Sequence, residues 1–303
     1  MSSKNVTRRK GPWPSNNNLH SVRDWFRQRG GLDDSRESES VIRLILDKVS
    51  GISVMDRVIT HWRASESELE RLASLADRLQ KGEPVQYALG ETSFAGLTFQ
   101  CDRRALIPRP ETEELLTEAL RRVRRCDGLN SHRVMDIGTG SGVLSIAWKS
   151  QRPDDDVHAL DVESEALELA KINAEGLDCF VNFFRSDIFQ VQQSNGIFYE
   201  PFDVIISNPP YIPNSDRFDM HPTVTEWEPS TALFVEDDNP LSFYRQIIHG
   251  CENEEWLAKG GLLALECHRN LTDQVLDLVP KTWTSKERMK DLQGNWRMVF
   301  ARR

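Results

Sequence analysis

One ten-residue stretch, residues 202–211, restricts the fold of this 303-residue chain more than any other. It begins with an apolar run at residues 204–206, which is typical of a strand buried on both faces of a sheet. It ends in Asn-Pro-Pro-Tyr at residues 208–211. Because two consecutive prolines provide no N–H for a strand ladder, the strand must stop there. Ligands bind open α/β sheets at the carboxyl ends of the strands, so we expect a site at this point.

The polar groups of this sequence suit a planar –NH2 group. The side-chain oxygen of Asn208 and the carbonyl of Pro209 can together accept both of its hydrogens, and Tyr211 can stack on its plane. Such a pose turns one face of a poorly nucleophilic nitrogen toward an electrophile, which is catalysis by orientation. An Asn-Pro turn alone is more often a local cap. Directly after a buried strand, the full sequence favours Asn208, Pro209 and Tyr211 as catalytic residues, with Pro210 as a further substrate contact.

A glycine-rich turn lies between an expected strand at residues 133–137 and an expected helix at residues 143–150. Its glycines let the backbone approach a ligand, and the free N–H groups at the helix start attract a carboxylate. The spacing differs from the dinucleotide fingerprint G-x-G-x-x-G. The turn consists of Gly138, Thr139, Gly140, Ser141 and Gly142.

Two acidic residues follow the next two expected strands. Asp161 ends a strand at residues 157–160, where a carboxylate can accept hydrogen bonds from both ribose hydroxyls; the alternative is an N-cap for the helix at residues 164–174. Asp187 follows a strand at residues 179–184 and can bind the exocyclic amine of a purine, with Ile188 packed on the ring. The sequence therefore predicts a nucleoside-bearing cofactor beside a bound –NH2 group.

Composition limits the other classes of function. No apolar run approaches the length of a membrane span. The net charge of −9 disfavours nucleic acid as the main partner. The five cysteines are scattered, with no C-x-x-C spacing, so we expect neither disulfides nor a metal site. The first ten residues are basic, as in an organelle import segment, but Gly11 and Pro12 would break the amphipathic helix that such a segment forms. We therefore prefer a disordered basic tip.

Three regions are expected along the chain. Residues 1–82 read as a small helical bundle that helps bind a macromolecular substrate, with Ser65 or Ser67 capping its last helix. Residues 83–104 read as a β-hairpin linker, and residues 105–303 as the α/β domain. Between Pro108 and Pro110 a rigid linker and a site wall are equally supported, and Thr112 is the expected cap of the following helix. Residues 212–240 are expected to form a lid or site wall, and residues 296–302 a final strand that pairs antiparallel.

These motifs resemble the class I S-adenosylmethionine-dependent methyltransferases. More closely, the chain is similar to the HemK/PrmC-type protein-glutamine methyltransferases that modify peptide chain release factors. The resemblance covers nearly the whole chain, and its most specific segment is Ile-Pro-Arg-Pro-Glu-Thr-Glu at residues 107–113. The other matching segments are residues 82–87, 136–142, 208–212, 228–229 and 291–299.

The resemblance implies a Rossmann-like, seven-stranded methyltransferase sheet with a final antiparallel strand. Gly138 to Gly142 would wrap the methionine part of S-adenosylmethionine, Asp161 would hold its ribose, and Asp187 with Ile188 would line its adenine. Asn208 would touch both cofactor and substrate.

The implied substrate is the glutamine of the Gly-Gly-Gln loop of a class I release factor, bound by a cytoplasmic monomer that contacts neither membrane nor nucleic acid; the mitochondrial matrix is the alternative location. Alternative substrates are another protein glutamine, as in a ribosomal protein, or an exocyclic amine of a DNA or RNA base. The chain departs from the family pattern at Ile188, where some relatives carry an aromatic, and at residues 266–268, where many have Glu-x-Gly.

Overall fold

The computed structural model describes residues 13–126, 131–190 and 197–303. The chain forms two compact units, with the division between Leu89 and Gly90. Within the described ranges, no helix is both long and apolar enough to cross a membrane.

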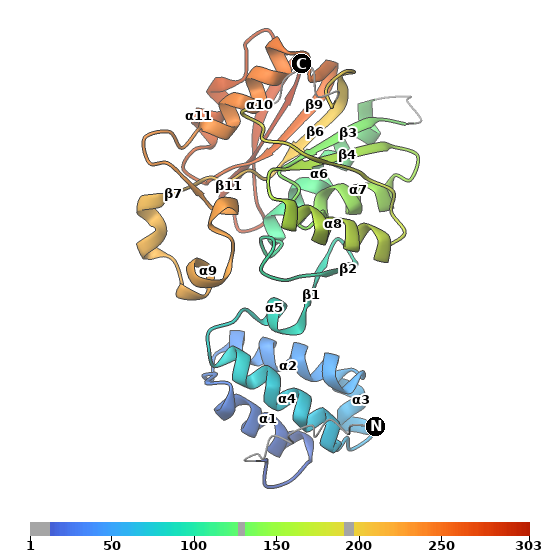
Figure 1. The fold of residues 1–303 in the computed structure, drawn as a ribbon, viewed down its shortest axis with the longest axis vertical. Helices are drawn as coiled ribbons and strands as arrows, with labels where there is room; N and C mark the ends of the chain where they lie inside the picture. The colour runs from blue at the N-terminus through green and yellow to red at the C-terminus, as the bar shows by residue number, and fades with distance from the viewer. Residues whose placement is uncertain (1–12, 127–130, 191–196) are drawn as a thin grey trace, which may run out of the picture. The chain divides into compact units, whose positions relative to one another are not determined.

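The N-terminal unit is a helical bundle, as predicted (Figure 1). Its core consists of apolar side chains that recur at helical spacing, such as Val22 and Phe26, which are both fully buried. Ser65 is the N-cap of the last long helix and forms a capping box with Glu68. The helices are α1 (Leu19–Arg29), α2 (Arg36–Ser50), α3 (Val54–Ile59), α4 (Glu66–Leu79) and α5 (Val85–Leu89).

The short helix α5 replaces part of the expected hairpin. Tyr87 falls within residues 83–104, which were expected to form the hairpin, but it lies in this helix. The guanidinium of Arg78 explains the difference, because it donates to the carbonyls of Tyr87 at 2.9 Å and Ala88 at 2.6 Å and so satisfies the helix end. The hairpin itself is β1 (Glu91–Phe94) and β2 (Leu97–Gln100). Its turn residues, Ala95 and Gly96, both have positive φ, as a two-residue type I′ turn requires.

The second unit contains a seven-stranded sheet with the order β10-β11-β9-β6-β3-β4-β5. The central strands are parallel, and β11 runs antiparallel to both of its neighbours, which confirms the expected final antiparallel strand. The strands are β3 (Arg133–Ile137), β4 (Asp156–Asp161), β5 (Asn182–Arg185), β6 (Phe202–Ser207), β9 (Leu257–Glu266), β10 (Ser285–Lys290) and β11 (Trp296–Arg302). The sequence did not indicate β10, because its side chains are mostly polar, as suits a strand at the sheet edge.

Helices cover both faces of this sheet, so its strands are apolar on both sides (Figure 1). In β6, Ile205 packs in the cluster that includes α10 and α11, whereas Val204 and Ile206 pack in the cluster that includes α6 and α7. The helices are α6 (Pro110–Cys126), α7 (Val143–Gln151), α8 (Ser164–Gly176), α10 (Ser242–Asn253) and α11 (Thr272–Leu278).

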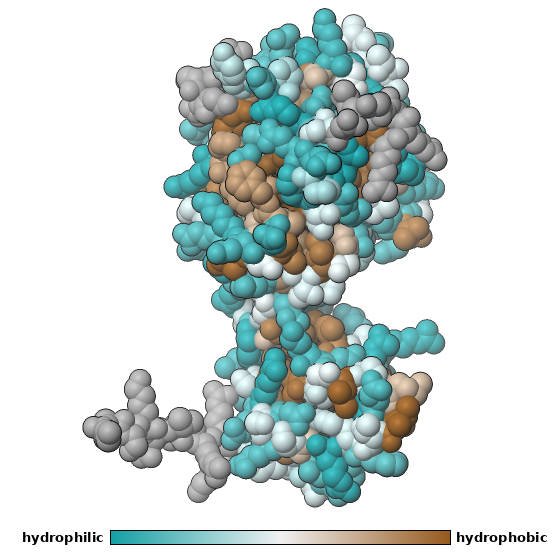
Figure 2. All heavy atoms as spheres, turned by 90° about the vertical axis from the view of Figure 1, so that its right-hand side faces the viewer, coloured by the Kyte–Doolittle hydropathy of each residue, from teal (hydrophilic) through white to brown (hydrophobic). Residues whose placement is uncertain are grey.

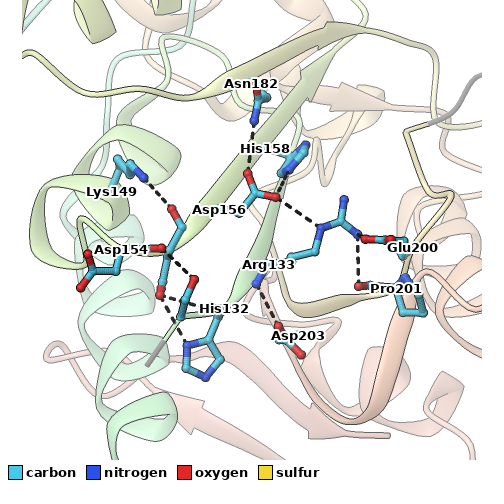
Figure 3. Close-up of polar contacts among 12 residues, drawn as sticks. His132, Arg133, Lys149, Asp154, Asp156, His158, Asn182, Glu200, Pro201 and Asp203 are labelled. Carbon is cyan, nitrogen blue, oxygen red and sulfur yellow. Dashed lines mark hydrogen bonds and ion pairs between the residues drawn. The ribbon is translucent and has the colours of Figure 1, made fainter. Parts of the chain in front are cut away.

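A polar network joins the amino ends of four neighbouring strands (Figure 3). The N–H of Arg133 donates to the carboxylate of Asp203 at 2.9 Å, and its guanidinium donates to the carbonyl of Glu200 at 2.7 Å. The carboxylate of Asp156 accepts from Asn182 at 3.3 Å and contacts His158 Nε2 at 2.7 Å. These contacts lie across the β3, β4, β5 and β6 starts, at the edge opposite to the one where the sequence predicts the site.

The segment expected to form a lid or wall has short elements rather than one long helix. They are β7 (Ile212–Pro213), η2 (Asn214–Asp219), α9 (Pro222–Trp227), η3 (Ser230–Ala232) and β8 (Phe234–Val235). Strands β7 and β8 pair parallel, so both ends of the segment are fixed to each other.

Candidate active site

A cavity of about 400 Å³ lies at the carboxyl ends of β3, β4 and β6. Its volume lies within the usual range for small-molecule sites. The structure therefore brings the glycine turn and the Asn-Pro-Pro sequence into one cavity, as the sequence predicted. The predicted residues that line it are Gly138, Thr139, Gly140, Ser141, Asp161, Asp187, Ile188, Asn208, Pro209 and Pro210.

Two predicted site residues do not line this cavity. Gly142 is the N-cap of α7, with φ +84°, and a Cβ at this position would lie 2.7 Å from the side chain of Ile146 and 3.1 Å from that of Ala170. Its role in the structure is thus the close approach of α7 and α8. Tyr211 is not among the residues that line the cavity, and its hydroxyl donates to the carboxylate of Glu266.

The glycine turn is held by the ends of two strands. The N–H groups of Gly138 and Thr139 both donate to the Leu160 carbonyl, at 2.9 and 3.0 Å. Asp136, fully buried at the end of β3, accepts the hydroxyl of Thr139 at 2.6 Å. Burial raises the pKa of the Asp136 carboxyl to about 7. The turn is therefore fixed before any ligand arrives.

Asp161 keeps acceptor capacity on both carboxylate oxygens. One oxygen accepts the Gly140 N–H at 2.8 Å, and the other accepts the Glu163 N–H at 3.0 Å. Each carboxylate oxygen can accept a second hydrogen bond. Burial raises the pKa of Asp161, and these N–H donors oppose the shift. The alternative role as N-cap of α8 is wrong, because the N-cap of that helix is Glu163.

Apolar side chains form the wall near Asp187. Its carboxylate accepts the N–H of Phe189 at 2.9 Å, which fixes the turn after β5, and Ile188 is buried. The rings of Phe189 and Phe243 meet edge to face with centroids 5.0 Å apart, and both line the cavity. The sequence analysis missed Phe243, because it lies on α10, more than fifty residues away in the chain.

Asn208 is held by a chain of hydrogen bonds that ends on a buried carboxylate. Its Nδ2 donates to the hydroxyl of Thr112 at 3.0 Å. That hydroxyl donates to Glu266 Oε2 at 2.6 Å, and the hydroxyl of Tyr211 donates to Glu266 Oε1 at 3.0 Å. The predicted N-cap role of Thr112 is wrong: α6 begins at Pro110, so Thr112 is the third residue of the helix and its hydroxyl faces the sheet.

The acceptors proposed for a substrate –NH2 group are free. Among the described residues, no donor is bonded to the side-chain oxygen of Asn208 or to the carbonyl of Pro209. Both residues line the cavity that the glycine turn also lines. The arrangement can therefore bind a group with two hydrogens beside a bound cofactor.

The Pro-Arg-Pro segment is a wall of the site, which decides between the two expectations for it. Pro108 and Arg109 line the cavity together with Pro229 and Phe234 from the lid segment. The buried Glu228 joins the two walls. One of its carboxylate oxygens accepts from Arg109 at 2.7 Å, and the other accepts from the Ile107 N–H at 3.1 Å.

Two family models match the chain. Residues 112–223 match the methyltransferase small domain, and residues 20–90 match the PrmC N-terminal domain. Among solved structures, the hMettl16 catalytic domain in complex with a 3′UTR hairpin aligns with a TM-score of 0.50 at 16% identity, over 78% of this chain and 82% of its own, which supports the fold alone.

Curated relatives match over nearly their full length. Release factor glutamine methyltransferase of Flavobacterium psychrophilum is 34% identical over 88% of this chain and 92% of its own. The protein of the same name from Bacteroides thetaiotaomicron is 37% identical over 88% and 93%, and that from Bacillus anthracis is 33% identical over 91% and 95%. With the family's methyltransferase and N-terminal domains both present, this chain belongs to the release factor glutamine methyltransferases.

Proposed function

We propose that the protein transfers a methyl group from S-adenosylmethionine to the side-chain nitrogen of the glutamine in the Gly-Gly-Gln loop of class I peptide chain release factors. One observation carries the proposal: two free acceptors, Asn208 Oδ1 and the Pro209 carbonyl, line the same cavity as the glycine turn. These acceptors match the two hydrogens of a carboxamide.

The cavity fits the methyl donor, which supplies an electrophilic methyl group on a sulfonium. The turn at residues 138–141 would hold its methionine part, which carries a carboxylate. Asp161, with a free lone pair on each oxygen, would accept the ribose hydroxyls. Asp187 and Ile188 would bind the adenine against the apolar wall.

Catalysis by these residues is orientation of the substrate nitrogen. The amide lone pair is delocalised, so alignment must supply much of the rate. Asn208 and Pro209 accept hydrogen bonds that strengthen as the nitrogen gains positive character, and therefore stabilise the transition state more than the ground state. No general base is required, because an alkylated amide releases its proton readily.

The N-terminal unit would help to bind the release factor. It carries a groove of about 850 Å³, lined by cationic and apolar side chains that include Arg23, Arg43 and Val58. Hydrophobic side chains are visible on the surface of this unit (Figure 2), and Val58 is 55% exposed. Such exposed apolar groups beside cations suit a protein partner. A monomer, no direct nucleic-acid contact and a cytoplasmic location stay predictions.

Peptide mapping tests the proposal. The protein is incubated with purified release factor and isotopically labelled S-adenosylmethionine, and the label is located by mass spectrometry. We expect one methyl group on the Gly-Gly-Gln glutamine. Label on a ribosomal protein or on nucleic acid instead would replace this substrate by one of the alternatives.

A substitution tests the role of the free acceptors. In Asn208→Ala the transition state loses one of its two acceptors, so turnover should collapse while the affinity for S-adenosylmethionine falls less. Wild-type turnover in this variant would show that Asn208 does not orient the substrate.

A further inference from the structure

We propose that Glu266 is a positioning residue: it sets the direction of the hydrogen bonds that reach Asn208, and so makes the site select a carboxamide over a carboxylate. The proposal rests on the function proposed above, and it adds the source of glutamine selectivity. Glu266 lies at the end of β9, is 1% exposed and does not line the cavity. It therefore acts through other residues.

The direction follows from the number of hydrogens on each group. An ionised carboxylate only accepts hydrogen bonds. The hydroxyl of Thr112 has one hydrogen, and at 2.6 Å it donates that hydrogen to Glu266. The same hydroxyl can then only accept from Asn208, 3.0 Å away, so Asn208 must present its –NH2 side to Thr112. Its oxygen is left for the cavity.

The hydroxyl donors on Glu266 maintain this direction against the effect of burial. Burial raises the pKa of the carboxyl, and Glu111 on α6 adds to the shift. The hydroxyls of Thr112 and Tyr211 and the cation of Arg297 on the adjacent β11 oppose it. Tyr211 donates to the second oxygen at 3.0 Å, so each carboxylate oxygen has a donor. A neutral amide in place of the carboxylate could donate to Thr112 and so reverse the direction of the hydrogen bonds between residue 266 and Asn208.

The consequence concerns the substrate. With Asn208 Oδ1 and the Pro209 carbonyl both free to accept, the site complements an –NH2 group. A glutamate carboxylate would place lone pairs against lone pairs and leave both acceptors unpaired. Sites built to bond an N–H discriminate strongly against groups that lack it. The buried Glu266 thus fixes which side of Asn208 the substrate meets.

Four single variants test this chain of hydrogen bonds from Glu266 to Asn208. Glu266→Gln keeps the shape but adds a donor, and Thr112→Val keeps the shape but removes the hydroxyl. Thr112→Ser restores the hydroxyl. Tyr244→Phe is the matched control, because the Tyr244 hydroxyl is buried and donates at 3.1 Å to the main-chain carbonyl of Glu266, not to its carboxylate.

The kinetic expectation separates positioning from folding. Glu266→Gln and Thr112→Val should lower kcat on release factor by about 10²-fold, as the loss of one oriented transition-state hydrogen bond does. The affinity of both variants for S-adenosylmethionine should change little, which shows that they fold. Thr112→Val also removes a donor from the buried Glu266 carboxylate, so its melting temperature should fall, whereas that of Glu266→Gln should change little. Thr112→Ser and Tyr244→Phe should stay within a few-fold of wild type. Wild-type kcat in both Glu266→Gln and Thr112→Val would overturn the inference.

Selectivity gives a second readout. Wild-type protein should bind release factor more tightly than a release factor whose Gly-Gly-Gln glutamine is changed to glutamate, and Glu266→Gln should reduce that preference. An unchanged preference in Glu266→Gln would contradict the proposal.

A third readout does not depend on turnover. The side-chain amide signals of Asn208, assigned by their loss in Asn208→Ala, should shift in Thr112→Val and return in Thr112→Ser. If release factor is not methylated at all, the proposed function fails, and this measurement still decides the inference. Asn208 signals that ignore both Thr112 variants would refute it.

Discussion

Replacing both ends of the Arg109–Glu228 ion pair should show a strong energetic coupling. This pair and the Ile107 N–H join the Pro-Arg-Pro wall to the lid segment. The Glu228 side chain is only 1% exposed, whereas that of Arg109 is 31% exposed. Each single substitution therefore leaves a different group without its partner.

The magnitudes follow from those exposures. Glu228→Ala removes the acceptor of the buried Ile107 N–H, which costs ~1–3 kcal/mol. In Glu228→Ala the partly exposed Arg109 is hydrated by water, so the loss of its ion-pair partner adds less than ~1 kcal/mol. Arg109→Ala leaves a buried carboxylate with a single N–H donor, which costs ~3 kcal/mol. The double variant leaves only the N–H unsatisfied, at ~1–3 kcal/mol. The sum of the two single effects should thus exceed the double effect by ~3–4 kcal/mol, because the cost of the unsatisfied N–H is the same in Glu228→Ala and in the double variant.

The assay is urea unfolding of the wild type and the three variants, followed by tryptophan fluorescence and by circular dichroism. Both probes are needed because the two units can unfold in separate transitions. Calorimetric titration with S-adenosylmethionine should show weaker binding in Glu228→Ala, since Pro108 and Phe234 line the cavity from the two joined walls. Single effects that add within ~0.5 kcal/mol would refute the reasoning, because residues that do not interact behave in that way.

Three further changes have defined outcomes. Gly142→Ala should lower the free energy of unfolding by more than Gly138→Ala, because a Cβ at Gly142 (φ +84°) would lie 2.7 Å from a side chain of α7. At Gly138 (φ +75°) no atom lies within 4 Å of the added Cβ, so we expect only the left-handed penalty of ~1–2 kcal/mol. Equal losses in urea unfolding would contradict this. The pKa of Asp136 is raised to about 7 in the folded protein. The protonated carboxyl therefore contributes to the free energy of unfolding in full below about pH 4, and this contribution is lost as the pH rises through about 7. In Asp136→Asn the free energy of unfolding, measured at several pH values, should fall by up to ~4 kcal/mol less between about pH 4 and pH 7 than in the wild type. An equal fall in both proteins would count against this expectation. Val58→Asp should raise KM for intact release factor but not for a short Gly-Gly-Gln peptide, whereas Phe180→Asp, at a 74% exposed site in the other unit, should change neither.

Local patterns were sufficient for most of the fold. The apolar runs of β3 and β6 could be recognised because strands covered by helices on both faces have little polar sequence. The start of α4 could be narrowed to Ser65 or Ser67 because a cap is a local contact, and the structure selects Ser65 through its capping box with Glu68. In contrast, β10 is an edge strand with polar side chains, and α5 depends on Arg78, so periodicity alone indicated neither.

The site divides in the same way. Asn208 and the glycine turn could be recognised in the sequence because proline and glycine have distinctive backbone properties that do not depend on distant residues. Thr112 and Glu266 are 154 residues apart in the chain, and only the pairing of α6 with the end of β9 brings them together. The segment of Thr112 was recognised by resemblance, whereas residues 266–268 depart from the family pattern, and the hydrogen bond between Thr112 and Glu266 could not be read from either segment.

The position of β11 has a consequence for biosynthesis. Residues 296–302 are inserted between β9 and β10, with Met298, Val299 and Phe300 almost completely buried. A nascent chain that has not yet released this segment from the ribosome must leave the β9 edge unpaired and its apolar faces open to water. The unit that carries the cavity therefore cannot complete its sheet during synthesis until residue 302 has emerged. Premature stop codons even a few positions before that point should yield aggregating protein rather than a weakened enzyme.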